Sequence, residues 1–385
     1  SGPAPGGMMR YGIPAYRLPR AVIDAGIGRI LGMGVRLESG LTVTDVRRAM
    51  ADDGFDAAFL AVGAQVGKRA YIPAGDSAKM LDAVSYLHDA SGDQPPLLGR
   101  RVAVYGGGDT AIDAARTARR LGATDAVIVY RRTRGQMPAH DIEVEEAAAE
   151  GVRLMWLSTI ARADGETLTI EKMELDETGF PRPTGELTEL AADAVVLALG
   201  QETDLSLVGG ADGIGVADGV VQVGGDQMTG CPGIFAGGDM VKGERTVTAG
   251  IGQGKRAASC IDAWLRGASW RQPEPAALAD YDQLNTWYYA DAPATVRPEL
   301  DVARRVTTFD EVVGGLDESN TRFEARRCLS CGNCFECDNC FGVCPDNAII
   351  KLGGRYEIDL DCCKGCGMCA AECPCGAIAM VPEQT

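Results

Sequence analysis

The sequence predicts an α/β protein in which two interleaved Rossmann-like units are followed by a small, cysteine-rich α+β domain. The first observation is a strand, a glycine turn and a helix start over 101–113, an order that presents backbone N–H groups to a dinucleotide. The second is an apolar strand ending in glycine, which occurs at 54–63 and again at 192–200. The third is a tail, 328–385, that holds every cysteine of the chain except two.

Composition limits the functions that this chain can have. The 385 residues leave room for two or three domains, and the formal net charge of −17 argues against nucleic acid or an anionic membrane as the main partner. No apolar run approaches the roughly 20 residues that a membrane span needs, and no signal peptide is visible. The two histidines, His88 and His140, are too few for haem, zinc-hydrolase or most serine–histidine triad chemistry.

The N-terminal part is expected to contribute to one of the two nucleotide sites. A loop rich in glycine and proline, 1–19, precedes helical periodicity and then a strand near Val35. The apolar segment 54–63 predicts a buried strand, and its last residue, Gly63, lets the backbone approach a flat or phosphorylated ligand. A connector with a helix near 78–90 leads to the next unit.

A dinucleotide is expected at the glycine turn that follows the strand 101–105. Gly106, Gly108 and Ala111 fill a G-x-G-x-x-A frame, a weak signal alone that is strengthened here by the strands and helix around it. The free N–H groups at the N-terminus of that helix would hold the pyrophosphate. The residues predicted at this turn are Gly106, Gly107, Gly108, Asp109 and Thr110.

The next strand ends in basic residues where an NADH site would have an acid for the ribose 2′-hydroxyl. The guanidinium groups of Arg131 and Arg132 suit a 2′-phosphate, which favours NADPH over NADH. A solvated basic turn is the alternative interpretation. Further along, the sequence predicts an acidic helix within 137–152 and a hairpin within 167–190.

A flavin is expected where the strand within 230–237 delivers Gly238 and Asp239 to a turn. Asp239 would face the sugar-alcohol hydroxyls of the flavin, and Gly200, at the end of the repeated strand, would allow a close backbone approach. Thr246, Val247 and Thr248 open a long helix whose N-terminus would face the pyrimidine edge of the flavin. A plain strand–loop–helix without a ligand is the alternative.

Residues 267–327 predict a connecting region with prolines at 273, 275, 293 and 298. Its aromatic trio Trp287-Tyr288-Tyr289 could dock a partner, although such a trio more often anchors a linker to the domain that it crosses.

Two cysteine runs in the tail carry the most specific signal in the sequence. Each reads C-x2-C-x2-C-x3-C-P and is followed by an Ala-Ile strand start. With this spacing three thiolates hold one [4Fe–4S] cluster, and the fourth reaches the other cluster. Zinc sites prefer pairs of C-x2-C, and disulfide frameworks belong to secreted chains, so two clusters are favoured. The expected ligand sets are Cys334, Cys337, Cys340 and Cys373 for one cluster, and Cys363, Cys366, Cys369 and Cys344 for the other.

The other cysteines are expected to bind no metal: Cys231, Cys260, Cys328, Cys331, Cys362 and Cys375. Cys328 and Cys331 extend the first run upstream and could exchange into its cluster or bind a third metal. A non-ligand role is favoured because the Cys344-Pro345 pair fixes the register of the run at Cys334. Cluster thiolates need a reducing compartment, so the sequence predicts a cytoplasmic protein.

In content and in order, these stretches resemble the glutamate synthase small-subunit type of NAD(P)H:acceptor flavoprotein. This family has a disulfide-reductase-like fold with two dinucleotide-binding domains. The tail looks like that of members serving as electron-transfer subunits, most of all the iron–sulfur flavoprotein associated with dissimilatory sulfite reductase. Subunits of 2-oxoacid:ferredoxin oxidoreductases match equally well by motif. The matching stretches are 6–14, which places Gly7 and Met8 at the flavin, 106–111, 130–132, 137–138, 233–239 and 246–258.

The resemblance also implies a division into domains. A strand, glycine turn, helix and strand that hold the ADP half of FAD in the family do not precede Gly6, so we expect this chain alone to hold FAD poorly. The expected parts are a partial FAD-binding domain over 1–95, an NAD(P)H-binding domain over 96–203, a return segment of the FAD domain over 204–266, a linker over 267–327 and a ferredoxin domain over 328–385.

The expected function is electron transfer between NADPH (or NADH) and a protein partner through FAD and two [4Fe–4S] clusters. The partner would be a ferredoxin, a sulfite reductase or a 2-oxoacid oxidoreductase, within a larger oligomeric redox system. No general base is required, which agrees with the small number of histidines. The alternatives are a non-catalytic conduit or assembly subunit with a vestigial nucleotide fold and, less favoured, a nucleotide-sensing regulator.

Overall fold

Two compact units make up the computed structural model, which describes residues 3–68, 72–73, 79–92, 94–209, 211–272 and 278–382. Unit 1 comprises 1–270 and 299–313, and unit 2 comprises 271–298 and 314–385. The predicted linker 267–327 therefore contributes to both units, and its predicted prolines at 273 and 275 lie outside the described residues.

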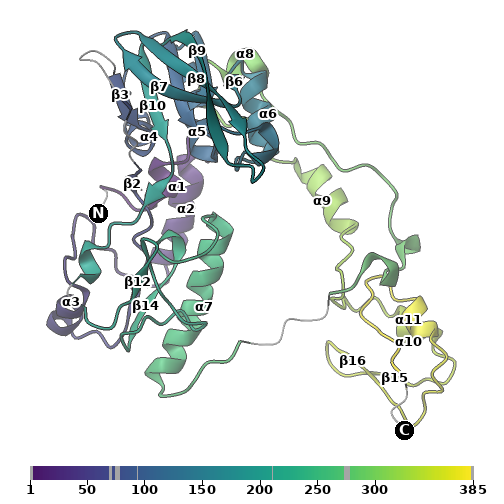
Figure 1. Cartoon of the computed structure of the whole chain (residues 1–385). Coiled ribbons are helices and arrows are strands. Elements are labelled where there is room, and N and C mark those ends of the chain that lie inside the picture. Colours follow the sequence, from purple (N-terminus) through teal and green to yellow (C-terminus); the bar gives the residue numbers. More distant parts are fainter. Residues whose placement is uncertain are drawn as a thin grey trace. The chain divides into compact units, whose positions relative to one another are not determined.

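A parallel five-stranded sheet forms the centre of unit 1, with strand order β3-β10-β4-β5-β6 (Figure 1). Both faces of this sheet are covered, which explains the nearly continuous apolar sequence of its strands. The strands are β3 (Lys79–Asp82), β10 (Ala194–Ala198), β4 (Arg101–Gly106), β5 (Asp125–Val129) and β6 (Arg153–Met155).

Side chains alternate between the two faces of this sheet. Val104 and Ile128 pack toward the helices, whereas Ala103 and Val127 pack into a second core with Leu168 of an antiparallel sheet. The helices on the first face are α4 (Ala83–Ala90), α5 (Asp109–Arg120) and α6 (Asp141–Ala149). The antiparallel strands on the second face are β7 (Ser158–Asp164), β8 (Thr167–Leu175) and β9 (Pro181–Ala191), with β8 and β9 forming the predicted hairpin.

The third core of unit 1 surrounds a short parallel pair, β1 (Ala58–Leu60) and β14 (Ile234–Ala236). Because these strands lie far apart in the sequence, the pair brings the segment 54–63 beside the segment 230–239, as interleaved units require. The other elements of this region are α1 (Gly7–Tyr11), α2 (Arg20–Leu31), α3 (Val46–Asp53), α7 (Val247–Leu265), β2 (Val66–Gly67), β11 (Gln201–Glu202), β12 (Val216–Ala217), β13 (Val220–Val221), and the 3-10 turns η1 (Arg134–Gln136), η2 (Ser206–Val208) and η3 (Gly238–Met240).

Three local predictions need correction. The strand expected near Val35 is wrong, because this segment is irregular and the Val35 side chain is 53% exposed, without a neighbouring strand among the described residues. The helix expected near 78–90 begins at Ala83, since Asp82 ends β3 and its side chain caps the helix at Ser85 N, 3.0 Å away. Residue 78 lies outside the described residues. The second Ala-Ile strand start, at 377–378, forms no strand.

The segment 299–313 packs on unit 1 although it comes from the predicted linker. It contains α8 (Val302–Arg305), and Val312, 2% exposed, donates its N–H to Tyr16 O at 2.9 Å. The ring of Phe309 lies 6.2 Å from that of Tyr16. In the sequence, this segment of unit 1 lies between two stretches that belong to unit 2. The sequence pattern did not predict this arrangement.

Unit 2 has short elements and a small interior. Its elements are η4 (Tyr281–Gln283), η5 (Thr286–Tyr288), α9 (Glu318–Arg326), α10 (Asn339–Val343), α11 (Met368–Ala371) and an antiparallel pair, β15 (Ile349–Lys351) with β16 (Tyr356–Ile358). Tyr288 donates its hydroxyl to Glu372, and Tyr289 donates to Leu329 O at 3.3 Å, whereas Trp287 is 87% exposed. Two of the three aromatic residues therefore anchor the linker to the cysteine-rich part.

Candidate functional site

A cavity of about 1380 Å³ lies in unit 1 at the carboxyl ends of β4 and β10. This edge of a parallel sheet is the usual place for a nucleotide ligand. The cavity is lined by both predicted nucleotide turns, one at the start of α5 and the other before α7. The residues from the glycine turn are Gly106, Gly107, Gly108, Asp109 and Thr110.

The first two glycines of the turn, Gly106 and Gly107, lie too close to their neighbours for a side chain. A Cβ added to Gly106, whose φ is +152°, would lie 2.1 Å from Ala198 O on β10. A Cβ on Gly107 would lie 2.4 Å from the ring of Tyr130. The helix α5 then begins at Asp109 without a side-chain cap on its first N–H groups. This helix N-terminus is therefore open toward the cavity, as a pyrophosphate site requires.

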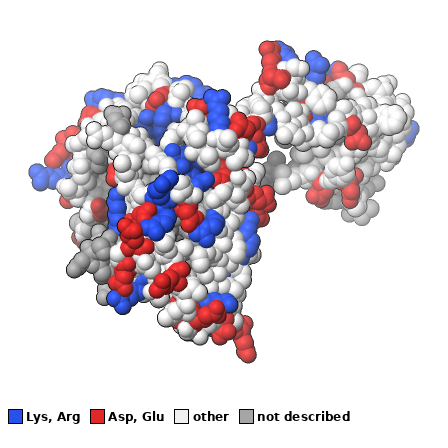
Figure 2. Space-filling model, turned by 90° about the horizontal axis from the view of Figure 1, so that it is seen from above, with Lys and Arg blue, Asp and Glu red and all other residues white. Residues whose placement is uncertain are grey.

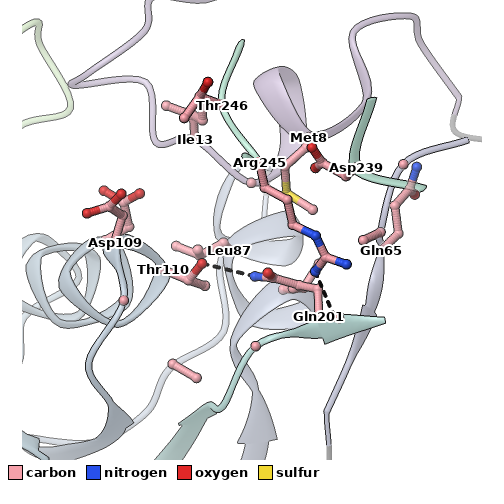
Figure 3. Close-up of a pocket in the computed structure, with 18 of the residues that line it drawn as sticks. Met8, Ile13, Gln65, Leu87, Asp109, Thr110, Gln201, Asp239, Arg245 and Thr246 are labelled. Atoms are coloured by element: carbon pink, nitrogen blue, oxygen red, sulfur yellow. Dashed lines mark hydrogen bonds between the residues drawn. The ribbon is translucent and has the colours of Figure 1, made fainter. Parts of the chain in front are cut away.

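The first turn of α5 is connected to the opposite side of the cavity through Gln201. The Gln201 amide donates to Thr110 Oγ1 at 3.0 Å, and Arg245 Nη1 donates to Gln201 O at 2.9 Å (Figure 3). Both Gln201 and Arg245 line the cavity, and the sequence analysis missed them. Gln201 directly follows the predicted Gly200, which also lines the cavity, but no local pattern indicates its contact with Thr110.

His140 also lines the cavity. It is exposed, and its backbone N–H and ring Nδ1 lie 3.0 and 2.9 Å from the carboxylate of Asp109. The loop before α6 is thereby held against the N-terminus of α5. Ala139 N adds a hydrogen bond to Gly107 O at 3.1 Å.

The two arginines after β5 have different environments. Arg131 is exposed and lines the cavity, whereas Arg132 does not line it and is half-buried. Within the described chain, Arg132 Nε is buried without a hydrogen-bond partner. The guanidinium of Arg134 pairs with Asp141 instead, at 2.5 Å. Of these guanidinium groups, the structure brings that of Arg131 to the cavity.

The flavin side of the cavity contains Gly7, Met8, Gly63, Asp239, Thr246 and Val247. Figure 3 shows Met8, Asp239 and Thr246 across the cavity from Thr110. The Thr246 hydroxyl accepts from Ala249 N at 3.1 Å and so caps α7. Gly238 and Thr248 do not line the cavity, and the Gly238 N–H is already bound to the side chain of Gln253 at 2.5 Å.

A buried ionic network lies beside the glycine turn. Arg17 and Asp113, 2.8 Å apart, both line the cavity. Behind them the guanidinium groups of Arg116 and Arg120 donate to Glu150 at 2.6–3.0 Å, and all three side chains are fully buried. Burial raises the pKa of Asp113 to about 6, although Arg17 acts in the opposite direction.

Tyr16 connects this network to the segment 299–313. The guanidinium of Arg120 lies 3.7 Å from the centre of the Tyr16 ring, and Tyr16 O accepts a hydrogen bond from Val312 N at 2.9 Å. The network therefore joins the N-terminal segment, α5, α6 and the 299–313 segment into one packed body. Because buried charges are costly unless paired, these side chains are strongly constrained in position.

The predicted cluster cysteines are neighbours in unit 2. Burial raises the pKa of the Cys340 thiol, while a backbone hydrogen bond at Phe341 acts in the opposite direction. Negative charge on Cys337, Cys334 and Cys373 also raises this pKa. These four cysteines form the first predicted ligand set. Burial likewise raises the pKa of Cys369, and charge on Cys363 and Cys366, from the second predicted set, acts in the same direction.

Backbone N–H groups point at several of these sulfur atoms. Ala348 N lies 3.2 Å from Cys344 Sγ, Ala377 N lies 3.3 Å from Cys373 Sγ, and Gly365 N lies 3.4 Å from Cys363 Sγ. All fourteen cysteines of the chain are free thiols. Among the described residues, however, no three Cys, His, Asp or Glu side chains converge closely enough to hold a metal ion as they stand. In donor chemistry the two cysteine sets fit iron–sulfur clusters, while the ligand assignment stays a prediction.

The charge pattern offers no surface for a polyanion in the view of Figure 2. Basic and acidic residues are interspersed on that face, and the chain carries 54 acidic against 37 basic residues. In the part of the chain that the structure describes, no helix has the length and apolar character needed to cross a bilayer.

Comparison with known proteins finds relatives that are named as subunits of NADP-dependent oxidoreductases. It is 36% identical over 361 residues to the NADP(+)-dependent formate dehydrogenase subunit beta of Moorella thermoacetica, covering 86% of this chain and 50% of that one. It is 31% identical over 377 residues to the NADPH-Fe(3+) oxidoreductase subunit beta of Geobacter sulfurreducens, covering 85% and 56%. The chain thus spans about half the length of these relatives.

A protein of Cereibacter sphaeroides, provisionally named as the small chain of an NADPH glutamate synthase, is 34% identical over 281 residues, covering 66% of this chain and 68% of that one. Among solved structures, FprA from Mycobacterium tuberculosis in complex with NADPH matches with a TM-score of 0.55 at 18% identity, covering 70% and 79% of the two chains, a likeness of fold. The family model for pyridine nucleotide-disulphide oxidoreductases matches residues 22–254. The α/β fold, the cavity and these matches together show that the chain belongs to the pyridine nucleotide-disulphide oxidoreductase family.

Proposed function

We propose that this chain is an iron–sulfur flavoprotein subunit that passes electrons between NAD(P)H and a protein acceptor. The observation that carries the proposal is that one cavity is lined both by the glycine turn of α5 and by the flavin-side residues before α7. A second nucleotide beside the first is the arrangement that a hydride transfer between two cofactors needs. Two cysteine motifs of the cluster type in the same chain supply the route for single electrons.

The residues of the chain would act by binding and orientation. The open N-terminus of α5 would hold the pyrophosphate of the dinucleotide, and Arg131 would hold its 2′-phosphate. Met8, Asp239, Thr246 and Val247 would hold FAD on the other side of the cavity. The flavin supplies the chemistry that converts a two-electron donor into single electrons for the two clusters. The eight motif cysteines would hold those clusters.

The proposed protein acceptor is supported only by the names of related proteins. Two of the matched proteins are named as beta subunits of larger oxidoreductases. We infer that this chain also works beside a protein partner, for which a sulfite reductase or a 2-oxoacid oxidoreductase is our expectation. The thiolates that would hold the clusters require a reducing compartment, which supports a cytoplasmic location.

The direct test is an iron count and an activity assay on the anaerobically purified full chain. We expect about eight iron atoms per chain and NADPH-dependent reduction of a tetrazolium dye that increases when FAD is added. A Cys363→Ser variant should lose about half of the iron while NADPH-dependent flavin reduction remains.

Three outcomes would contradict the proposal in different ways. Absence of iron, or zinc in its place, would refute the cluster assignment. Eight iron atoms with no NADPH oxidation in the presence of FAD would favour a non-catalytic electron conduit. Binding of NADPH without turnover and without iron would favour a regulator.

A further inference from the structure

One buried cysteine of unit 2 belongs to neither predicted ligand set. Cys375 is 2% exposed, and its Sγ lies 3.8 Å from Sγ of Cys373, which is 7% exposed. Either sulfur can be the donor of a hydrogen bond at this distance. Because Cys373 would be a thiolate when it binds iron, the proton of the pair would lie on Cys375.

The backbone fixes Cys375 at this position. Gly332 N donates to Cys375 O at 2.6 Å, which ties the residue to the start of the cysteine-rich segment. Ala377 N donates to Cys373 Sγ at 3.3 Å. The turn 373–377 therefore presents two donors to the Cys373 sulfur, a backbone N–H and a thiol.

The other cysteine run lacks the second donor. There, Ala348 N donates to Cys344 Sγ at 3.2 Å, which repeats the backbone contact. At the position two residues after the cysteine, this run has Asp346, whose carboxylate pairs with Lys364 at 3.1 Å. The two runs share their spacing but differ at this position, where the second run has a thiol that touches a predicted ligand.

We propose that Cys375 is a positioning residue that donates an S–H···S hydrogen bond to Cys373 and raises the reduction potential of the cluster that Cys373 serves. This inference rests on the proposed function, because it requires the cluster to be bound. A hydrogen bond to a ligand sulfur withdraws negative charge from the cluster and so stabilises the reduced, more negative state. Cys373 belongs to the predicted ligand set that also contains Cys334, Cys337 and Cys340.

The consequence is an asymmetric pair of clusters. Motifs of equal spacing would otherwise give two clusters of similar potential, between which electrons have little preferred direction. With Cys375 beside one of them, that cluster takes an electron more readily than it would without the thiol. The residue therefore sets the order in which the two clusters are reduced.

The test is an anaerobic redox titration of the full chain followed by electron paramagnetic resonance. In Cys375→Ala we expect one of the two reduction steps to move to a lower potential, while the other step and the iron content stay as in the wild type. Cys375→Ser keeps an O–H donor and should restore most of the shift. Cys362→Ala is the matched control, because Cys362 is an exposed neighbour of a ligand in the other set and should change neither step.

Three results would overturn the inference. Loss of about half of the iron in Cys375→Ala would make this residue a ligand. Equal shifts in reduction potential in the Ala and Ser variants would assign the effect to packing or hydration. If neither variant shifts a reduction step, Cys375 does not affect the potential. Wild-type protein without iron would refute the proposed function itself, and this inference with it.

Discussion

The interiors of the two units of this chain differ in the residues that are buried in them. In the described part of the chain the three hydrophobic cores lie in unit 1, where two of them cover the faces of the parallel sheet and the third surrounds β1 and β14. In the described part of unit 2 the buried residues are few, and half of them are cysteines: Cys340, Ala348, Ile349, Cys373, Pro374 and Cys375. The cavity of unit 1 is therefore shaped by packed protein, whereas the small interior of unit 2 includes two predicted metal ligands, Cys340 and Cys373.

This difference indicates how each site depends on its cofactor. In unit 1 the glycine turn is fixed by contacts with Ala198 and Tyr130 that need no ligand. In unit 2 apolar side chains such as Leu360, 81% exposed, cover no core. A small domain that buries so little apolar surface gains most of its folding free energy from the metal that it binds. The protein alone shapes the cavity of unit 1, whereas the proposed site in unit 2 would be completed by the clusters themselves.

Removing iron tests this comparison with the largest expected effect. Chelation under anaerobic, reducing conditions should unfold unit 2 and leave unit 1 folded, because only unit 2 uses the metal as its core. Limited proteolysis followed by mass spectrometry should show cleavage within 328–382 increasing by about tenfold or more, while the segment 101–198 stays protected. Untreated protein at the same protease concentration is the control. Equal loss of protection in both units, or in neither, would contradict the comparison.

A second prediction concerns the glycine turn of unit 1. In Gly106→Ala the new Cβ would lie 2.1 Å from Ala198 O, so the turn or β10 must move. A strained residue of this kind costs about 1–3 kcal/mol, and a loss of binding free energy of that size raises the dissociation constant of NADPH roughly 5–150-fold. Isothermal titration with NADPH is the measurement.

Two controls keep this result specific. Gly28→Ala adds a methyl group on a helix where nothing lies within 4 Å, and it should bind NADPH normally. Iron content should stay unchanged in Gly106→Ala, because unit 2 does not depend on the turn. A normal NADPH affinity in Gly106→Ala would show that the cavity is less rigid than its contacts indicate.

Local patterns predicted the elements that carry both sites, and non-local contacts explain what was missed. The strand–turn–helix over 101–120, the hairpin and the long helix after Thr246 are confirmed, because each is determined by periodicity and turn residues within its own segment. Val35 failed because a strand also needs a partner, and the described structure offers it none. Valine favours strands because its branched side chain packs well on a half-buried sheet surface, but the side chain of Val35 is exposed.

The cavity residues show the same limit. Gln201 contacts Thr110, and Arg245 contacts Gln201, from segments far apart in the sequence, and no spacing rule predicts such contacts. The network of Arg116, Arg120 and Glu150 was equally invisible, because charged residues on a helix usually indicate a solvated face. Sequence reasoning therefore located the cofactor turns but not the side chains that fix their distance from one another.

The arginines after β5 allow a sharper test of what the structure adds to the sequence. Arg131→Ala should raise the dissociation constant of NADPH about tenfold or more, since a hydrogen bond to a charged group contributes about 1.5–3 kcal/mol. The affinity for NADH, which lacks the 2′-phosphate, should change little. Arg132→Ala is the matched control, because Arg132 does not line the cavity and should leave both affinities unchanged. Equal losses of NADPH affinity in the two variants would mean that both arginines contact the 2′-phosphate, as the sequence pattern alone predicts.

The smallest expected effect comes from the ionic network that only unit 1 contains. Burial raises the pKa of Asp113 to about 6, above the value of about 3.9 for an unfolded chain. Between these values the folded state holds a proton that the unfolded state has released, so stability from this carboxyl is complete below about pH 4 and is lost as the pH rises through 6. We expect the free energy of unfolding of the wild type, relative to Asp113→Asn, to fall by about 1 kcal/mol between pH 5 and pH 7. Denaturant unfolding of unit 1 at pH 5, 6 and 7 measures this difference, and Asp53→Asn, an exposed carboxyl, controls for the loss of one charge. A difference that stays constant or grows over this range would show that the pair with Arg17 keeps Asp113 ionised, and that the network is a set of permanent charges.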